Sequence, residues 1–198
     1  MHAGGGLSEY PGLPPVSPDK ARQLLGAAEE LHSAAAVARA VARLAQEISA
    51  RLADGFPLVL SIMRGSVIFA GQLLPQLDFP LEFDYLDVTR YGAATRGGEI
   101  SWRVSPDTSV AGRNVLVLDD ILDEGRTLAA VRERLIAAGA LEVYLAVLAE
   151  KEIGRAKPVK ADFVGLAVPD RYVFGCGMDV GGLWRNLPAI YAVKSGEE

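Results

Sequence analysis

Apolar residues in the first third of the chain recur with helical spacing and then gather in a strand-like run. Between positions 34 and 53 they recur every three or four residues, which predicts one face of an amphipathic helix. An earlier helix is expected to begin at Ser17 and Pro18, because serine caps helices and proline suits the first helical position. The apolar run at 58–62 predicts a buried strand, and a helix is expected over 66–77.

The rest of the chain alternates between strand and helix patterns. Further strands are predicted at 83–88, 115–118, 143–148 and 162–168. A helix is expected over 127–138, and a hairpin over 99–104 within a glycine-containing loop at 91–110. Strands that alternate with helices are typical of a parallel sheet covered by helices. We therefore predict an α/β fold, with a twisted parallel sheet and helices on both faces.

Composition narrows the class of protein. A chain of 198 residues is long enough for one domain with a real core and short for two. We predict a flexible arm rich in glycine and proline at residues 1–18 and a single domain at 19–198. Half of the residues are hydrophobic, which indicates a folded protein. The formal charge of -5 disfavours binding to nucleic acid through phosphate neutralisation.

Other features bear on the cellular location. The single cysteine, Cys176, cannot form an internal disulfide, as is usual in a reducing compartment. The first 15 residues do not combine a positively charged region with a following apolar stretch, so they do not resemble a signal peptide. Apolar runs such as 66–77 are too short to span a bilayer. We expect a cytoplasmic protein that does not associate with membranes.

The candidate chemistry lies where the predicted strand 115–118 ends. Asp119 and Asp120 follow this strand directly, and a loop of small residues then opens the next helix. Ligands of open parallel sheets bind beyond the carboxyl ends of the strands, so this loop is expected to face a ligand. N–H groups at a helix start favour an anion such as phosphate. Gly125 allows a close approach of the backbone, and the Thr127 hydroxyl can donate a hydrogen bond.

Two adjacent carboxylates beside a phosphate repel it unless they bind hydroxyl groups or a metal. A sugar 5-phosphate with free 2′- and 3′-hydroxyls, held with magnesium, satisfies both halves of the motif. A solvent-exposed acidic turn is the simpler alternative, but the apolar strand before the acids and the Gly125–Thr127 helix start favour a binding site. Arg126 could add positive charge there, or its side chain could point to solvent. The chain contains neither G-x-x-x-x-G-K-[S/T] nor G-x-G-x-x-G, which argues against a P-loop site and a Rossmann dehydrogenase.

Several motifs together resemble a known family. The segment Asp119–Leu128 is similar to the diphosphate-sugar motif of the type I phosphoribosyltransferases, and residues 35–194 resemble their hypoxanthine-guanine branch. The similarity includes the segments Ile62–Ser66, Arg90–Gly92 and Val168–Asp179, in the family's order. The resemblance implies a small hood built from the N- and C-terminal segments. It also implies transfer of a phosphoribosyl group from phosphoribosyl diphosphate to hypoxanthine or guanine, with Mg²⁺ as cofactor.

For the sugar diphosphate and its magnesium, the resemblance implies ten residues of this chain: Asp119, Asp120, Glu124, Gly125, Arg126, Thr127, Arg64, Gly65, Asp179 and Arg185. The acid pair would hold the ribose hydroxyls, directly or through magnesium, and the 124–127 loop would bind the 5-phosphate. Arg64, Gly65 and Arg185 would contact pyrophosphate, and Asp179 would bind magnesium and pyrophosphate. Family members carry a cis peptide at the position between Met63 and Arg64.

For the purine base, the resemblance implies a general base, a donor and a stacking platform. Asp123 would take the N7 proton, although a carboxylate near a helix start can also serve the helix dipole alone. Lys151 would donate to the purine O6, although a lysine between glutamates is usually a solvated surface residue. Tyr172 would stack on the base, and the Val173 backbone would bond to its edge; aromatic residues in strands are more often core.

The Arg90–Tyr91 segment resembles the family's mobile lid, where many relatives carry Ser-Tyr. Because Arg90 departs from that pattern, it is an alternative contact for pyrophosphate. Homodimers and homotetramers are usual in the family. A non-catalytic nucleotide-sensing regulator on the same fold is the alternative, but the acidic charge balance argues against its RNA-binding surface. Orotate and adenine transferases usually lack an acid at the position of Asp123.

Overall fold

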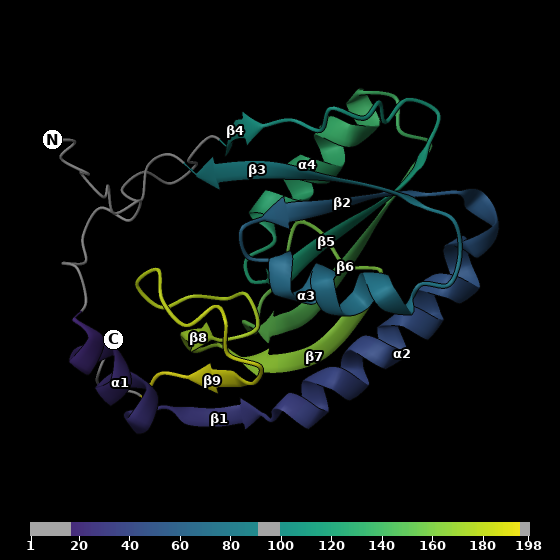
Figure 1. Cartoon of the computed structure of the whole chain (residues 1–198). Helices are drawn as coiled ribbons and strands as arrows, with labels where there is room; N and C mark the ends of the chain where they lie inside the picture. The colour runs from purple at the N-terminus through teal and green to yellow at the C-terminus, as the bar shows by residue number, and fades with distance from the viewer. Residues whose placement is uncertain (1–16, 91–99, 195–198) are drawn as a thin grey trace, which may run out of the picture.

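The computed structural model describes residues 17–90 and 100–194 (Figure 1). Its helices are α1 (Pro18–Ala27), α2 (Ala34–Leu52), α3 (Val67–Leu73) and α4 (Arg126–Ala137). Its strands are β1 (Glu29–His32), β2 (Leu58–Met63), β3 (Glu82–Arg90), β4 (Ile100–Val104), β5 (Asn114–Leu122), β6 (Glu142–Glu152), β7 (Phe163–Pro169), β8 (Val173–Phe174) and β9 (Ile190–Ala192). Short 3₁₀ turns lie at Ala53–Gly55 and Leu74–Gln76.

The larger sheet has six strands in the order β4-β3-β2-β5-β6-β7. The strands from β3 to β7 in this order run parallel, while β4 at the edge is antiparallel to β3. α2 and α3 cover one face of this sheet, and α4 covers the other (Figure 1). The predicted α/β fold with helices on both faces is therefore confirmed, and the hairpin strand β4 makes the sheet mixed.

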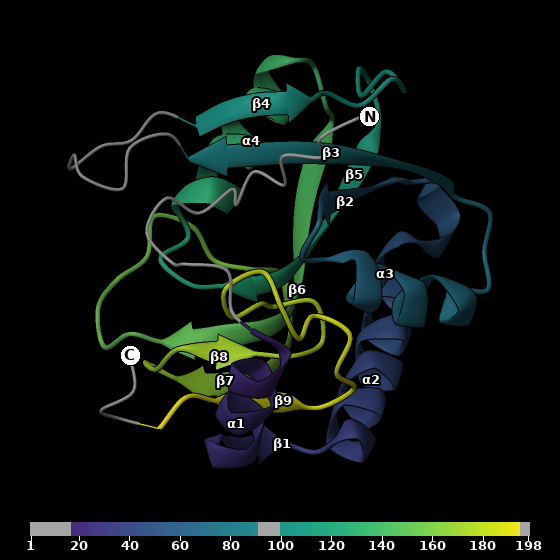
Figure 2. The ribbon, with the colours of Figure 1, turned by 60° about the vertical axis from the view of Figure 1, so that its left-hand side comes forward.

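A second sheet forms the hood that the resemblance implied. Its three strands have the order β1-β9-β8 and pair antiparallel, so a segment near the N-terminus joins the C-terminal strands (Figure 2). The indole Nε1 of Trp184 also donates to the carbonyl of Ala21 at 3.1 Å, which connects α1 to the C-terminal segment. The strands of the hood are too short to give a clear apolar pattern, and the sequence did not predict them.

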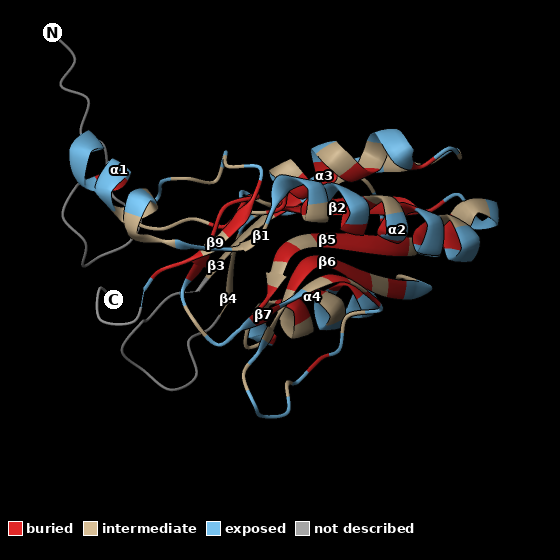
Figure 3. Ribbon diagram, turned by 90° about the horizontal axis from the view of Figure 1, so that it is seen from below, coloured by how far each residue is buried: buried red, intermediate tan, exposed pale blue. Residues whose placement is uncertain are grey.

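The core is organised around β5, which is covered on both faces. Leu116 and Leu118 pack with α2 and α3, whereas Val115 and Val117 pack with α4. Each of these four side chains is fully buried, and β5 is largely red in Figure 3. A strand with two covered faces is apolar at successive positions instead of alternating. This explains why the run 115–118 was the clearest strand signal in the sequence.

Two predicted strands are longer than the sequence indicated. The run predicted to end at 118 continues to Leu122, and the run predicted to end at 148 continues to Glu152. The prediction that the acid pair follows its strand was therefore wrong, and Lys151 lies within β6 instead of after it. Main-chain pairing of β5 with β6 carries on to the Leu122–Glu150 register, because ladder hydrogen bonds do not depend on side-chain polarity.

Other boundaries differ slightly from the prediction. The helix expected over 66–77 ends at Leu73, and a 3₁₀ turn that contains Pro75 follows. Proline cannot donate a helical hydrogen bond, so it ends the regular helix. The arm predicted for residues 1–18 lies outside the described residues except for Ser17 and Pro18, which form the N-cap and first turn of α1. Within the described ranges, no helix is both long and apolar enough to cross a bilayer.

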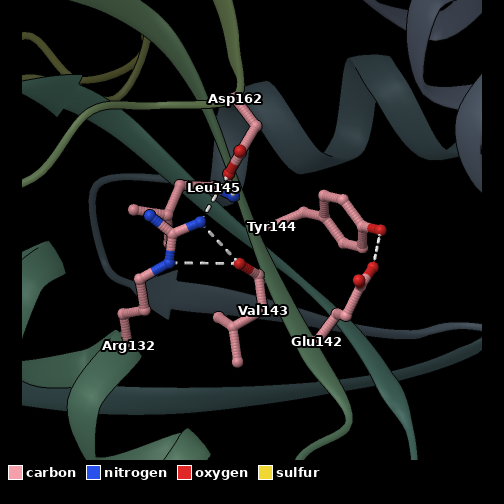
Figure 4. A network of polar contacts seen from close by, with 6 residues as sticks. All are labelled: Arg132, Glu142, Val143, Tyr144, Leu145 and Asp162. Atoms are coloured by element: carbon pink, nitrogen blue, oxygen red, sulfur yellow. Dashed lines mark hydrogen bonds and ion pairs between the residues drawn. The ribbon is translucent and has the colours of Figure 1, made fainter.

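An arginine on α4 ties the layers together at the end of the sheet opposite the acids (Figure 4). Arg132 donates to the carbonyl of Val143 at 3.2 and 2.8 Å and pairs with Asp162 at 3.0 Å. Asp162 also accepts from the backbone N–H of Leu145 at 2.8 Å. The guanidinium thus links α4, β6 and the residue before β7, which fixes the start of the strand that carries Lys151.

At Gly165, the backbone of β7 lies close to β6 and α2. A Cβ added there would overlap the carbonyl oxygen of Leu148 and press against Leu44 of α2. We expect Gly165→Ala to destabilise the fold by about 1–3 kcal/mol through overpacking. At this chain length each kcal/mol lowers the melting temperature by about 2–4 °C. Gly71→Ala on α3, where the added Cβ meets open space, should leave the melting temperature unchanged or slightly raised. Equal melting temperatures for both variants would contradict this account.

Candidate active site

A pocket of about 330 Å³ opens at the carboxyl ends of β2 and β5. The predicted site residues that line it are Arg64, Gly65, Asp119, Asp120, Asp123, Glu124, Gly125, Thr127, Asp179 and Arg185. These residues come from β2, β5, the loop before α4 and the segment after β8, so the fold gathers positions that are far apart in the sequence. The position agrees with the rule that open parallel sheets bind ligands beyond the carboxyl ends of their strands.

The loop after β2 lies directly against the acid pair. The peptide bond between Met63 and Arg64 is cis, as the resemblance implied. A Cβ added at Gly65 would overlap the carboxyl group of Asp120, and one added at Gly177 would overlap the carbonyl of Gly65. Three separate segments thus meet where side chains would not fit. Sequence reasoning missed Gly177, although its place in the Gly-Cys-Gly run was the available signal.

The adjacent acids lie where the surroundings disfavour the charged carboxylate. Asp120 is buried, and its backbone N–H donates to Asp119 Oδ1 at 3.0 Å. Burial and the neighbouring Asp120 carboxylate hold the pKa of Asp119 well above its usual range. Burial also raises the pKa of Asp120, although the Asp119 hydrogen bond and the charge of Arg185 oppose this shift. The pair therefore favours ligands that relieve repulsion, namely hydroxyl donors or a cation.

The loop before α4 is arranged to bind an anion. Gly125 is the N-cap of this helix and has a φ of 80°, a left-handed conformation that glycine adopts without strain. The first N–H groups of α4 follow it, and Thr127 lines the pocket. Glu124 pairs with Arg155 at 2.7 Å and with Arg126 at 3.5 Å. Arg126 is 56% exposed and does not line the pocket, which favours the solvent-facing alternative for its side chain.

The segment after β8 supplies a second charged pair. Arg185 Nη2 lies 2.5 Å from Asp179 Oδ1, and its Nη1 donates to the carbonyl of Gly177 at 2.6 Å. The other oxygen of Asp179 accepts from the backbone N–H of Gly182 at 2.6 Å. Trp184, next to Arg185, has a φ of 68° and its indole bonds to α1, as described above. The N-terminal helix therefore helps to fix the segment that carries both charged residues.

The predicted base-binding residues do not line this pocket, but Lys151 contacts one of its residues. Lys151 Nζ donates to Asp123 Oδ2 at 2.9 Å, and the two side chains are 13% and 43% exposed. Lys151 lines a neighbouring cavity of about 600 Å³ formed by the connection between β6 and β7. Tyr172 is 46% exposed just before β8, and Val173 is buried in that strand. Neither Tyr172 nor Val173 lines either cavity, so their base-binding roles stay predictions.

The predicted lid is not part of the described site. The backbone of Arg90 ends β3, whereas its side chain and the whole of Tyr91 lie outside the described residues. Sequence reasoning also missed Lys157, whose ammonium donates to the backbone carbonyls of Leu122 and Lys151. The basic run around Lys157 resembles a surface segment, so the sequence carried no signal that this lysine is buried.

The mostly parallel sheet brings an acid pair on its central strand to a glycine-containing loop at a helix start, beside a small three-stranded hood. Residues 27–180 match the phosphoribosyl transferase domain, and the chain belongs to this family.

Particular relatives are similar over most of their length. The hypoxanthine-guanine phosphoribosyltransferase of Bacillus subtilis (strain 168) is 37% identical over 80% of this chain and 88% of the relative. The enzyme of the same name from Lactococcus lactis subsp. lactis (strain IL1403) is 40% identical over 70% of this chain and 75% of the relative. The crystal structure of a hypoxanthine phosphoribosyltransferase from Staphylococcus aureus has a TM-score of 0.79 at 28% identity. The structural match covers 84% of this chain and 91% of the Staphylococcus aureus chain.

The raised pKa values of the acid pair predict that ionisation of these carboxyl groups lowers the stability of the fold. A carboxyl group whose pKa is higher in the folded state loses stabilising free energy as the pH rises through that pKa. We therefore expect Asp119→Asn to raise the melting temperature at pH 7.5 by a few degrees, at about 2–4 °C per kcal/mol. The gain should shrink as the pH falls toward 4, because the wild-type pair takes up protons above the ordinary pKa range of a carboxyl group. Thermal unfolding at several pH values measures this, and a lower melting temperature for the variant at pH 7.5 would refute it.

Proposed function

We propose that this protein is a purine salvage enzyme. It transfers the 5-phosphoribosyl group from phosphoribosyl diphosphate to N9 of hypoxanthine or guanine, giving IMP or GMP and pyrophosphate. The observation that carries the proposal is the Asp123–Lys151 pair, 2.9 Å apart beside the anion-binding loop. Oxygen O6 and the N7 proton are neighbours on one edge of a 6-oxopurine. A lysine donor next to a carboxylate acceptor is complementary to that edge. The relatives that share the fold are named as transferases of this kind.

The sugar diphosphate is assigned to the 330 Å³ pocket. The helix-start N–H groups after Gly125 and the Thr127 hydroxyl bind the 5-phosphate. Asp119 and Asp120 accept hydrogen bonds from the ribose hydroxyls, which replace the solvation that the two acids lose on burial, the main cause of their raised pKa values. Glu124 lines the pocket, and its ion pair with Arg155 anchors the loop to the connection between β6 and β7.

The base is assigned to the space between Lys151 and Tyr172. Lysine has donors and no acceptor, so it favours the O6 carbonyl of hypoxanthine or guanine over the amino group of adenine. Tyr172, which is 46% exposed, offers its ring for stacking, and the backbone of Val173 bonds to the edge of the base. The roles of Lys151, Tyr172 and Val173 in base binding stay predictions.

The reaction breaks the bond between C1 of the ribose and pyrophosphate while N9 of the base attacks C1. Asp123 accepts the N7 proton, so the purine ring does not retain a positive charge. Arg64 and Arg185 lie on the pocket wall, where their guanidinium groups stabilise the negative charge on the departing pyrophosphate. No covalent enzyme intermediate is needed, because catalysis rests on positioning and electrostatics.

The donor set fits magnesium that is shared with the substrate. Among the described residues, no group of three His, Cys, Asp or Glu side chains is arranged to hold a metal alone. Mg²⁺ is usually bound by one or two carboxylates together with substrate oxygens, which matches Asp119 and Asp120. When bound, magnesium would neutralise part of the pyrophosphate charge. Asp179 would be a further carboxylate for it; one of its oxygens is paired with Arg185 and the other accepts from the N–H of Gly182.

Self-association as a homodimer or homotetramer agrees with an apolar surface on β3. Phe83 and Tyr85 are 45% and 43% exposed. They pair in register with Val59 and Ser61, so they lie on the face of the sheet that also carries α3. Aromatic side chains of this kind are enriched at protein interfaces. A second copy of the chain is the partner we infer, and the cytoplasmic location stays a prediction.

Pyrophosphate release tests the proposed function directly. The protein is incubated with phosphoribosyl diphosphate, magnesium and one base at a time: hypoxanthine, guanine, xanthine, adenine or orotate. We expect turnover with hypoxanthine or guanine. We expect none with adenine, because Lys151 has no acceptor for its amino group, and none with orotate, because this pyrimidine lacks the O6–N7 edge of a 6-oxopurine. Turnover with adenine alone would assign a different base to the site. No turnover with any base, despite binding of phosphoribosyl diphosphate, would favour a nucleotide-sensing protein on the same fold.

Lys151 provides a separate test of base selection. We expect Lys151→Gln to lower kcat/KM for hypoxanthine about 10–100-fold, because a hydrogen bond from a charged donor contributes about 1.5–3 kcal/mol. Discrimination against adenine should fall, since the glutamine amide can also accept. Steady-state kinetics with both bases measures this. Lys160→Gln, at an exposed lysine of the same connection, should behave like the wild type. Unchanged kcat/KM for Lys151→Gln would remove Lys151 from the base site.

A further inference from the structure

Lys157 is a buried cation in the connection between β6 and β7. Its side chain is 9% exposed. Its ammonium donates to the carbonyl of Leu122 at 2.9 Å, to the carbonyl of Lys151 at 2.6 Å and to Glu150 Oε1 at 3.1 Å. A lysine has three N–H donors, so these acceptors use all of them. The group is therefore not arranged to bind a ligand, although it lines the cavity beside Lys151.

The two carbonyls belong to the backbone of the candidate base site. Leu122 directly precedes Asp123, and the second carbonyl is that of Lys151 itself. The parallel pairing of β5 with β6 ends at the Leu122–Glu150 register. Beyond that point, the Lys157 ammonium bridges the ends of the two strands. It connects them at the place where one strand delivers the carboxylate and the other the lysine that form the 2.9 Å pair.

We propose that Lys157 is a positioning residue that sets the separation of Asp123 and Lys151 and thereby the fit of the purine base. The proposal rests on the proposed function, because it assigns the effect of Lys157 to binding and turnover of the base. A displacement of about 1 Å at reacting groups can cost about 100-fold in rate. A link between the two strand ends therefore has a large influence on catalysis without touching the substrate.

The stem of Lys157 has a second contact that makes a clean variant possible. Its Cβ lies 3.5 Å from the position that a Cβ would take at Gly125, so the stem packs beneath the phosphate-binding loop. Methionine keeps an unbranched stem of similar length but has no N–H donor. Lys157→Met therefore removes the bridge between the strand ends and retains the packing beneath the loop. Binding of the sugar diphosphate should change little, whereas the fit of the base should be lost.

The experiment compares the wild type with Lys157→Met, Lys157→Arg and the exposed control Lys160→Met. For each protein we would measure the melting temperature, the Kd of phosphoribosyl diphosphate by calorimetry, and kcat and KM with hypoxanthine. Lys157→Met should raise KM for hypoxanthine and lower kcat, each about tenfold, with the Kd of phosphoribosyl diphosphate within threefold of the wild type. Lys157→Arg should recover part of the loss, because its planar guanidinium keeps the charge but cannot reach all three acceptors in the same directions.

The outcomes separate positioning from simple stabilisation. If Lys157→Met is less stable but keeps kcat and KM within twofold well below its melting temperature, the proposal is overturned. Equal losses for both substrates would also overturn it. If Lys157→Met does not fold, the comparison passes to Lys157→Arg, for which unchanged kinetics with hypoxanthine would be decisive against the proposal. Failure of the proposed function is distinguishable, because the wild type and Lys160→Met would then be inactive with every base.

Discussion

β5 is covered by helices on both faces, and its main-chain ladders to β2 and β6 hold it at the centre of the larger sheet. Its pairing with β6 continues past the last of its successive apolar residues. The strand pairing therefore holds Asp119 and Asp120 at a position where burial disfavours their charged forms. The apolar run 115–118 supplies burial free energy, and residues 119–122 line the pocket. The position of the acid pair at the pocket follows from this one buried strand.

The charged side chains of the candidate site only partly neutralise one another, which favours ligands that balance the remaining charge. Burial raises the pKa of both acids, and the neighbouring Asp120 carboxylate raises the pKa of Asp119 further. Arg185 offsets part of this charge but is itself held by Asp179 and by the carbonyl of Gly177. Glycine at positions 65 and 177 lets three segments approach without side chains between them. A site of this kind is less stable than a neutral pocket would be, and hydroxyl or cation ligands relieve the difference.

The candidate residues for the sugar and for the base lie on neighbouring strands. β5 leads into the glycine-containing loop and Asp123, while β6 carries Lys151. These strands stop pairing at the register just before Asp123 and Lys151. The ammonium of Lys157 connects the strand ends at that point through hydrogen bonds to two backbone carbonyls. In the proposed function, the alignment of base and sugar therefore depends on the β6–β7 connection as well as on the strands themselves.

The sequence by itself determined the layer architecture and most of the sugar site. The helical period at 34–53 became α2, and the apolar run 115–118 became the buried centre of β5, because burial on covered faces is encoded in local spacing. The chemical types and order of residues 119–127 were enough to indicate an anion beside an acid pair. Only the tertiary structure decided that both acids lie within the strand, that Arg126 does not line the pocket, and that the side chain of Lys157 is only 9% exposed. Strand pairing and the burial of a basic side chain depend on partners that are distant in the sequence, and local patterns do not contain that information.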